Sequence, residues 1–257
     1  MCCFSVARAP FSLLGWLFAP RVHVSKTSIF ARRLPSGRQA LVYSMHLRTA
    51  REVAMILPIP TATAAEDALE LVDLSGHASF FSDLESLFVF AQTAAPRKGG
   101  FGPRLASRPR LVVHRVGSFE ASFVPTRGDF DRLDPRFRMP EVLFDSLPEY
   151  AAYGFAVFQL AAQSAAIHPM ALTFQPREEG SLFFPTVHVH DGTLREIARF
   201  DHALYWQSDA AETAPLDERS LMNPLRDVKG LLDPSKPVIR RRLSGKLPNR
   251  DTRVSLA

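Results

Sequence analysis

Two histidines in the second half of the chain alternate along one predicted strand. His188 and His190 lie within the stretch 183–192, FFPTVHVHDG, in which apolar and polar residues alternate. A strand points every second side chain to the same face, so both imidazoles would project together. His202 follows after a turn signal, within a second apolar run. If the two runs form a hairpin, three imidazoles meet on one face of a sheet.

Carboxylates flank the same histidines. Asp191 directly follows the pair, and Asp201 directly precedes His202. Three imidazoles and one carboxylate suit a divalent ion such as zinc, with the carboxylate either on the metal or hydrogen-bonded to a ring nitrogen. A metal site of His188, His190, His202 and Asp191 would fit a metal-dependent hydrolase. Two other interpretations stay open: surface or structural histidines, and acid–base chemistry without a metal.

The N-terminus carries the second chemical candidate. Removal of Met1 is favoured before a small residue, and it would leave Cys2 with a free α-amine beside its thiol. An N-terminal nucleophile uses that amine as the base for its own attacking group. The start of the chain is similar to the starts of some amidohydrolases and glutamine amidotransferases, which makes Cys2 a candidate catalytic residue. An inert terminus is the alternative.

Other chemical motifs are missing from the sequence. It contains no G-x-G-x-x-G, no G-x-x-x-x-G-K-[ST], no G-x-S-x-G and no H-E-x-x-H. The chain has no recognisable catalytic constellation, so whether it is an enzyme stays open. The first expectation is a soluble β-rich domain of unknown function. A metal-dependent hydrolase and an N-terminal-nucleophile amidohydrolase are the alternatives.

The elements that must hold these residues are mostly strands. Two β-rich runs on either side of 34–37 (LPSG) predict a hairpin, and the run 51–57 adds a third strand to form an antiparallel meander. Further strands are expected at 110–116, 119–124, 153–160, 170–174, 182–190 and 200–205, and short helices at 63–70, 80–88, 130–133 and 221–229. We therefore predict an α+β fold that is predominantly antiparallel β, with sandwich-like or meandering sheets and a few short helices.

One β-rich domain is expected over residues 1–234. A chain of 257 residues with 46% hydrophobic residues and 20 Phe can bury a large core. The stretch 94–109, rich in Gly, Pro and basic residues, predicts a mobile surface loop. Residues 235–257 contain seven basic residues and one acidic one, whereas the whole chain has a formal net charge of only +5. The positive charge therefore lies in a segment that the sequence predicts to be a basic, disordered tail.

Expected partners and location follow from charge and cysteine content. A neutral body gives no strong signal for nucleic-acid binding beyond the basic tail. Cys2 and Cys3 are the only cysteines, and because adjacent cysteines rarely pair, a reducing and cytoplasmic location is expected. The apolar run 11–20 is too short to span a membrane, so no transmembrane segment is expected. This run is either a loop or a degenerate export signal.

Several stretches together are similar to a group of bacterial proteins with no known activity. They are MC-x-F at the N-terminus, RQALVYSM at 38–45, LPIP at 57–60 and FPTVHVHDG at 184–192. The resemblance extends over residues 1–207. It implies a shared fold and no particular chemistry. Relative to that group, residues 8–20 look like an insertion.

Overall fold

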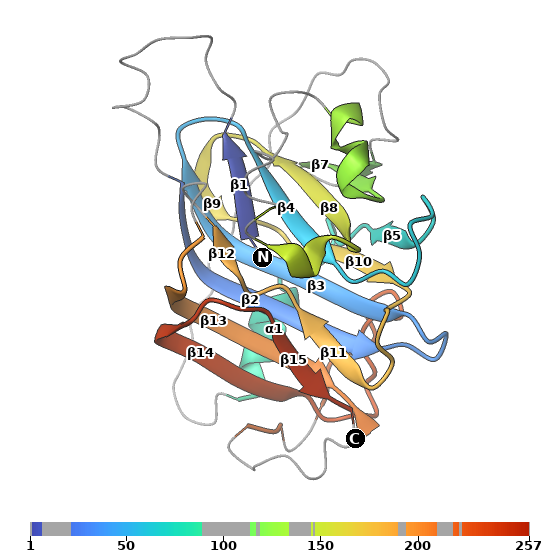
Figure 1. Ribbon diagram of the computed structural model, residues 1–257. Coiled ribbons are helices and arrows are strands. Elements are labelled where there is room, and N and C mark those ends of the chain that lie inside the picture. The colour runs from blue at the N-terminus through green and yellow to red at the C-terminus, as the bar shows by residue number, and fades with distance from the viewer. Residues whose placement is uncertain are drawn as a thin grey trace.

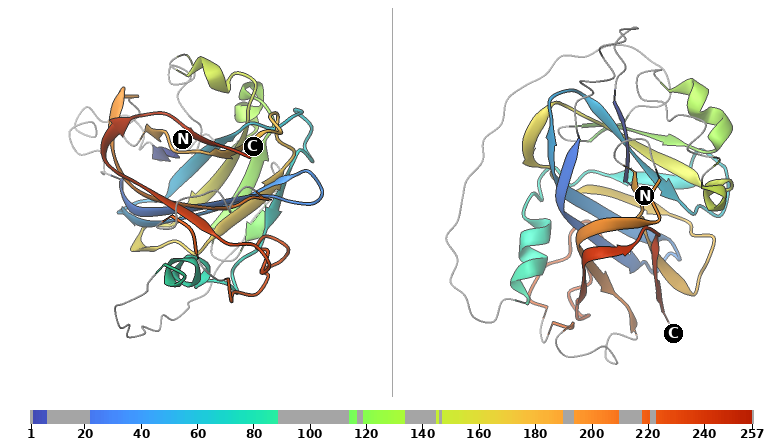
Figure 2. Two further views of the ribbon diagram at one scale, coloured as in Figure 1. Left: turned by 90° about the horizontal axis from the view of Figure 1, so that it is seen from below. Right: turned by 60° about the vertical axis from the view of Figure 1, so that its left-hand side comes forward.

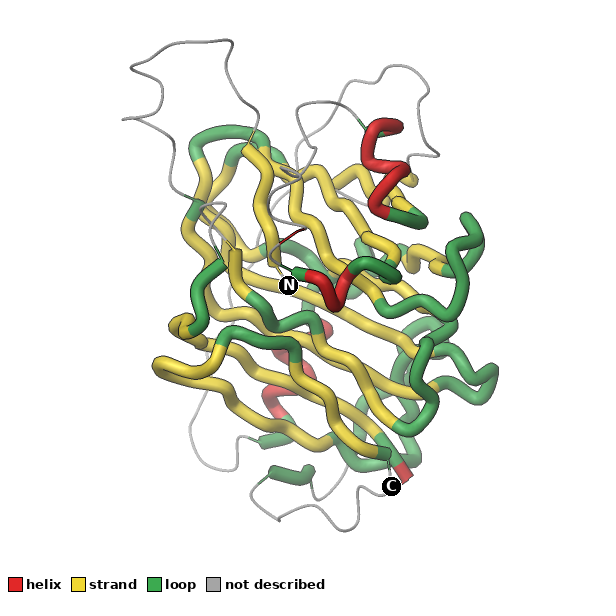
Figure 3. Tube along the Cα trace, viewed as in Figure 1, coloured by secondary structure: helices red, strands yellow, loops and turns green. Residues whose placement is uncertain are grey.

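The computed structural model describes residues 2–6, 22–88, 114–116, 119–133, 145, 147–189, 194–209, 218–220 and 223–256. For 2–6, 114–116 and 163 only the backbone is described. Within these ranges the chain is mostly β with few short helices, which confirms the predicted β-rich class (Figures 1 and 3). None of the helices described is long and apolar enough to cross a membrane.

The first large sheet has six strands in the order β12-β1-β4-β8-β7-β6. They are β1 (Cys2–Val6), β4 (Val53–Ile59), β6 (His114–Val116), β7 (Phe119–Val124), β8 (Gly154–Leu160) and β12 (His188–Val189). Neighbours are antiparallel except β1 and β12, which run parallel. The strands expected at 110–116 and 119–124 form β6 and β7, which pair with each other antiparallel.

The second large sheet has seven strands in the order β14-β13-β2-β3-β10-β5, with β9 also paired to β3. They are β2 (His23–Arg33), β3 (Gln39–Thr49), β5 (Leu69–Val72), β9 (Gln163–Ala166), β10 (Met170–Phe174), β13 (Ile197–Gln207) and β14 (Ile239–Pro248). Here β2 and β13 run parallel. Two further strands, β11 (Ser181–Phe184) and β15 (Thr252–Ser255), pair with each other.

The hairpin of β2 and β3 confirms the turn expected at 34–37. Arg33 pairs with Gln39 across it, and Gly37 takes the positive φ of 81° that such a turn needs. The three-stranded meander is wrong, because β4 leaves β3 and pairs with β1 and β8 in the other sheet. Every residue of β4 is buried. A strand covered on both faces lacks the polar alternation that would indicate which sheet it joins.

Apolar residues that alternate along the strands build a core between the two large sheets. Ile29 and Ala31 of β2 belong to this core, whereas Phe30 between them belongs to a cluster on the opposite side of its sheet. Strand β4 divides in the same way, with Met55 in the shared core and Ile56 on the outer side. The period of two thus gives each sheet an inner and an outer apolar face.

Short helical elements cover the two outer faces from opposite sides of the molecule (Figure 2). Helix α1 (Phe80–Ser86) confirms the helix expected at 80–88 and lies on the seven-stranded sheet, where the ring of Phe80 is 5.5 Å from that of Phe30. The 3-10 turns η2 (Arg127–Arg132) and η4 (Pro148–Tyr150) pack on the six-stranded sheet. Both sheets are therefore buried on two sides over part of their area.

Two other expected helices do not form in the described ranges. Residues 63–70 lead into β5, whose Leu69 enters the shared core. Residues 223–229 contain no helix, and Leu225 and Val228 pack against the outer face of the seven-stranded sheet. Helical propensity is a weak preference that tertiary burial overrides in both segments. The stretches 11–20 and 94–109 lie outside the described residues.

The expected disordered tail is wrong, because residues 239–255 form β14 and β15. Strand β14 pairs with β13 along its whole length. Only Ile239 of β14 is buried, and the basic side chains Arg240, Arg241, Arg242 and Lys246 lie on the surface of an edge strand. Charged side chains on an edge strand deter pairing with foreign strands. Because these basic residues are concentrated in one segment, the composition of residues 235–257 resembles that of a disordered tail. That the chain forms one domain stays a prediction.

Candidate functional site

His188 and His202 meet across the two large sheets. Their Nε2 atoms are 3.0 Å apart and their ring centroids 4.7 Å apart. The expected hairpin between them is wrong, because β12 pairs with β1 in one sheet and β13 pairs with β2 and β14 in the other. Pro185 interrupts the strand expected at 182–190, so β11 ends at Phe184 and β12 begins in another sheet.

The contact between the two rings restricts their protonation. A hydrogen bond between two Nε2 atoms needs one ring to donate an N–H and the other to accept with a lone pair. If both rings were imidazolium ions, two N–H groups and two positive charges would face each other, and the contact would break. One ring therefore donates an Nε2–H, and the other accepts it with an unprotonated Nε2.

His202 is the buried member of the pair. Only 3% of its surface is exposed, whereas His188 is partly exposed. The Nδ1 atom of His202 lies 3.8 Å from Oδ1 of Asp201. The backbone N–H of Lys26 donates a 2.6 Å hydrogen bond to the other carboxylate oxygen. Lys26 has a φ of 52° within an irregular part of β2, so a bulge in the neighbouring strand orients this carboxylate.

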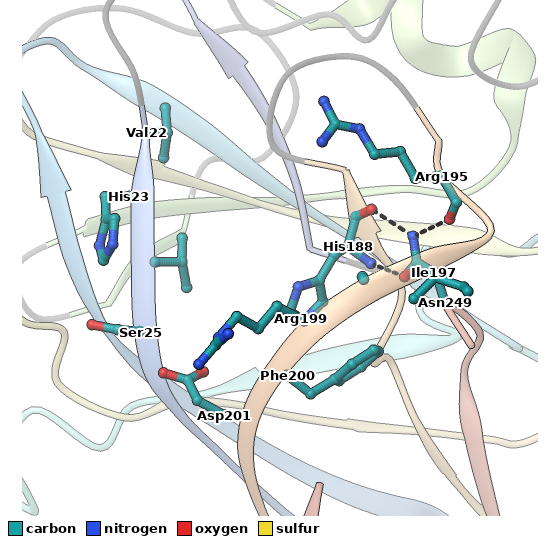
Figure 4. A pocket seen from close by; sticks show the side chains of 12 residues that line it. Val22, His23, Ser25, His188, Arg195, Ile197, Arg199, Phe200, Asp201 and Asn249 are labelled. Atoms are coloured by element: carbon teal, nitrogen blue, oxygen red, sulfur yellow. Dashed lines mark hydrogen bonds between the residues drawn. The ribbon is translucent and has the colours of Figure 1, made fainter. Parts of the chain in front are cut away.

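Asn249 holds the backbone of His188 in place (Figure 4). Its Oδ1 accepts the N–H of His188 at 2.7 Å, and its Nδ2 donates to the carbonyl of the same residue at 2.9 Å. A second bond from Nδ2 reaches the carbonyl of Arg195 at 2.9 Å. The side-chain amide thus imitates the paired hydrogen bonds of an adjacent strand. Asn249 lies in the segment that the sequence predicts to be a disordered tail, and no pattern in the sequence distinguishes it from other polar residues there.

An open pocket of about 440 Å³ lies beside His188 (Figure 4). Residues near the ends of β2, β12 and β13 line it, together with Asn249. Phe200 forms an apolar part of the wall, with its ring centroid 4.6 Å from that of His188. The charged and titratable lining residues are His23, His188, Arg195, Arg199 and Asp201. The pocket gives His188 a side that faces solvent, whereas His202 is not among the lining residues.

The two chemical candidates of the sequence lie side by side in the fold. Strand β1 runs parallel to β12, and Cys2 is the register partner of His188. On its other side β1 pairs with β4, so the N-terminal strand is an inner strand of the six-stranded sheet. The sequence could not show this proximity, because it depends on pairing between opposite ends of the chain. Only the backbone of Cys2 is described.

The other two predicted ligands, His190 and Asp191, lie outside the described residues. Among the side chains that the structure describes, no three from His, Cys, Asp and Glu are arranged to hold a metal ion. The described part of the predicted cluster is therefore the histidine pair with Asp201 beside it.

Comparisons with known proteins indicate a fold and no family. No family model matches the chain, and no curated protein matches it. Among solved structures it is similar to the crystal structure of the caspase-8/P35 complex, with a TM-score of 0.50 and 12% identity over 90% of this chain and 96% of that chain. The crystal structure of baculovirus P35 itself matches with a TM-score of 0.49 and 12% identity, over 91% of this chain and 97% of that one. At such identity, the likeness to the chain of the complex shows the fold alone.

Proposed function

We propose that this chain is a protein-binding domain whose partner is a cysteine protease of the caspase class. The observation that supports it is the likeness to the chain in the caspase-8/P35 complex, which extends over 90% of this chain and 96% of that chain. A likeness of this extent involves the whole arrangement of sheets rather than one common motif. Because one fold can serve several functions, the proposal depends on a direct binding test.

Contacts of α1 with the seven-stranded sheet would hold a partner-binding surface in a fixed position. Glu85 anchors α1 to the seven-stranded sheet, since its Oε1 lies 3.1 Å from Nη1 of Arg240 and its Oε2 accepts the hydroxyl of Tyr205. The guanidinium of Arg240 also stacks 4.2 Å above the ring of Phe88. Residues 89–113 follow directly and end at β6, in the other large sheet. Binding residues are commonly carried by segments that a rigid scaffold holds at both ends.

The charge of this segment bears on the specificity of the partner. The stretch 94–109, which the sequence predicts to be a surface loop, contains Arg97, Lys98, Arg104 and Arg108 and no acidic residue. A protease of the same class that prefers arginine or lysine fits the segment better, because its specificity pocket would accept a basic side chain.

Two proteases test the proposal: caspase-8, and a caspase-fold protease that cleaves after arginine or lysine. The full chain should inhibit the second in a saturable way and elute with it in size-exclusion chromatography. Mass spectrometry of the complex would locate any bond that is cut. Replacing Arg97 and Lys98 with alanine should weaken inhibition by about tenfold or more, the effect of losing an interface hot spot.

The matched control replaces two basic residues outside the segment, Arg226 and Lys229, and should leave inhibition unchanged. Binding to neither protease would refute the proposal. Binding to caspase-8 with no effect on the second protease would support the partner class and refute the basic specificity.

A second candidate function rests on the position of Cys2. Its backbone register beside His188 favours a thiol next to an imidazole, a combination that activates cysteine nucleophiles. In this proposal the chain is an N-terminal-nucleophile amidohydrolase after removal of Met1. Intact-mass analysis should show that Met1 is lost, and Cys2→Ser should abolish labelling by a thiol-reactive amide analogue. Cys3→Ser should keep the labelling, and a retained Met1 would exclude the mechanism.

A further inference from the structure

We propose that an extended peptide segment of another protein inserts into the seven-stranded sheet between β2 and β13. These two strands are neighbours, yet their pairing begins only at Thr27 and His202. Before that point, residues 23–25 pair with β3 and residues 197–201 pair with β14, and the described strands supply no partner on the side between them. These two stretches form a fork that is open at one end. The inference goes beyond the proposed protease partner and does not depend on it.

The pocket beside His188 lies in this fork. His23 and Ser25 of β2 line one side of it, and Ile197, which is 60% exposed, lines the other side from β13 (Figure 4). Its volume of about 440 Å³ is within the usual range for ligand pockets. Five residues of a strand extend over roughly 16 Å, so the edge at 197–201 has the length of a short extended segment.

The backbone of β13 directs unused hydrogen-bonding groups into the fork. In an antiparallel ladder, alternate residues direct their N–H and C=O groups to the same neighbour. The N–H of Asn249 donates to the carbonyl of Glu196, so the even-numbered residues of β13 bond to β14. Ile197 and Arg199 therefore direct their backbone groups to the other side, where no described residue bonds them.

The same reasoning applies to β2. Strand β3 bonds β9 through Met45, whose carbonyl accepts the N–H of Ile167, so its even-numbered residues bond to β2. Their register partners are residues 23 and 25, which leaves the backbone groups of Val24 directed into the fork. At the closed end, the N–H of Lys26 donates a 2.6 Å hydrogen bond to the carboxylate of Asp201. There a side chain takes the place of a neighbouring strand as acceptor.

Side chains around the fork define the chemistry of the inserted segment. Val22 and Val24 pack against the core between the sheets, and Phe200 is only 3% exposed, so the inward side of the fork is apolar. On the outward side, Arg199 is exposed, lines the pocket and has no ion-pair partner among the described residues. A strand in which apolar and acidic residues alternate matches both sides, with its apolar side chains inward and a carboxylate beside Arg199.

A synthetic peptide tests the fork in the full chain. The probe is a five-residue peptide of alternating glutamate and valine, with fluorescein at its N-terminus and an amide at its C-terminus. Its fluorescence anisotropy should rise and saturate at one peptide per chain, whereas lysine in place of glutamate should abolish binding. Arg199→Ala should weaken binding about fivefold, as expected for one exposed ion pair. Arg226→Ala, which removes an exposed arginine outside the pocket, should leave binding unchanged.

Methylation of the peptide amides distinguishes insertion from addition to a free sheet edge. An inserted strand bonds β2 through one alternate set of its amides and β13 through the other set. N-methylation of either set should therefore weaken binding about tenfold or more. A strand added to a free edge bonds through one set only. If one methylated peptide binds as well as the unmodified one, insertion between β2 and β13 is wrong.

Hydrogen exchange locates the bound peptide on the chain. The amides of Val24, Ile197 and Arg199 should exchange rapidly in the free chain and slowly with peptide bound. Those of Ala198 and Phe200 should be slow in both states, because they already bond to β14. Unchanged exchange at Val24 and Ile197 with saturating peptide, or no saturable binding below about 1 mM, would overturn the fork as a peptide site. Binding that appears only after deletion of residues 10–20 would mean that this chain's own segment fills the fork, and would overturn the assignment to another protein.

Discussion

Strand β13 carries a polar cluster on each of its two faces, and the two clusters differ in chemistry. On the outer face, the hydroxyl of Tyr205 donates to Glu85 of α1, and Arg240 and Arg242 of β14 contact the same carboxylate. On the inner face, His202 contacts His188 of the other sheet. The outer cluster joins opposite charges that are partly exposed, whereas the inner one joins two bases of which one is buried.

The difference separates a structural role from a candidate functional one. A carboxylate between two guanidinium groups and a hydroxyl is a complementary set, and its evident effect is to fix α1 on the sheet. At the inner face, Leu204 and Trp206 of the same strand belong to the core between the sheets. An apolar residue at position 202 would continue that core, because a buried polar group contributes to stability only when its hydrogen bonds are made. Two imidazoles take that place instead, so polar rings are buried where the pattern of the strand would put core side chains.

Both clusters contain side chains from residues 234–257, so removal of this C-terminal segment should cause the largest loss of stability. Residues 234–257 supply Arg240 and Arg242 to the outer cluster and Asn249 to the inner one. They also include the buried Val238 and Ile239 and the strand that pairs with β13. Truncation after Asp233 should lower the free energy of unfolding by more than about 5 kcal/mol, a large part of the usual total. A cooperative thermal melt within a few degrees of the full chain would contradict this.

Local features of the fold were predictable from the sequence, because neighbouring residues encode them. The sequence 34–37 specifies a hairpin turn through a proline and a glycine, and the apolar spacing of 80–88 specifies a helix with one buried side. Strands β8 and β10 were likewise found from their own residues. In each case, the residues that carry the sequence pattern are the same residues that form the turn, helix or strand.

Long-range pairing was not predictable in the same way. The choice of sheet for β4 and the parallel pairs β1–β12 and β2–β13 depend on strands far away in the chain. The approach of His188 to His202 was expected, yet its geometry depends on two sheets and a proline break rather than on a hairpin. Asn249 carried no signal, because an amide that clamps a backbone looks like any polar residue in a turn.

The hydrogen bonds from the Asn249 side chain to the backbone of His188 make the inner cluster depend on one amide. Asn249→Ala should lower the free energy of unfolding by about 2–3 kcal/mol, since it removes three hydrogen bonds and leaves the N–H and carbonyl of His188 without them. Asn249→Asp keeps an acceptor for the N–H and loses both donors, so its effect should be intermediate. Urea denaturation measures both. Equal stability of Asn249→Ala and the unaltered chain would show that the clamp is dispensable.

The inner cluster should also show coupling between its two rings. His202→Leu should cost about 1–3 kcal/mol, because the hydrogen bond between the two rings is lost in a partly buried place. The double variant His188→Leu/His202→Leu should recover most of that loss, since two apolar side chains can pack together and need no hydrogen bond between them. A double-mutant cycle from denaturant melts measures the coupling. Losses that simply add would indicate that the rings do not stabilise each other.

The outer cluster should respond to alkaline pH through Tyr205. Burial first, and then the hydrogen bond and charge of Glu85, raise the pKa of its hydroxyl above the ordinary value of 10.0. In the unfolded chain the hydroxyl ionises as the pH passes 10, whereas the folded chain keeps the proton to higher pH. The unfolded state then binds fewer protons than the folded state, so the free energy of unfolding falls as pH rises.

The expected slope from Tyr205 approaches about 1.4 kcal/mol per pH unit above pH 10, the value for one proton. Tyr205→Phe should remove this part of the slope while costing about 1.5–3 kcal/mol near neutral pH, where one hydrogen bond to a carboxylate is lost. Burial also raises the pKa of Tyr153, so some slope should remain in that variant. His202→Leu should leave the alkaline slope unchanged, because its ring lies on the other face of β13. A slope that is the same with and without Tyr205 would mean that the hydroxyl ionises as readily in the folded chain as in the unfolded one, and the outer cluster would then be looser than its contacts with Glu85 imply.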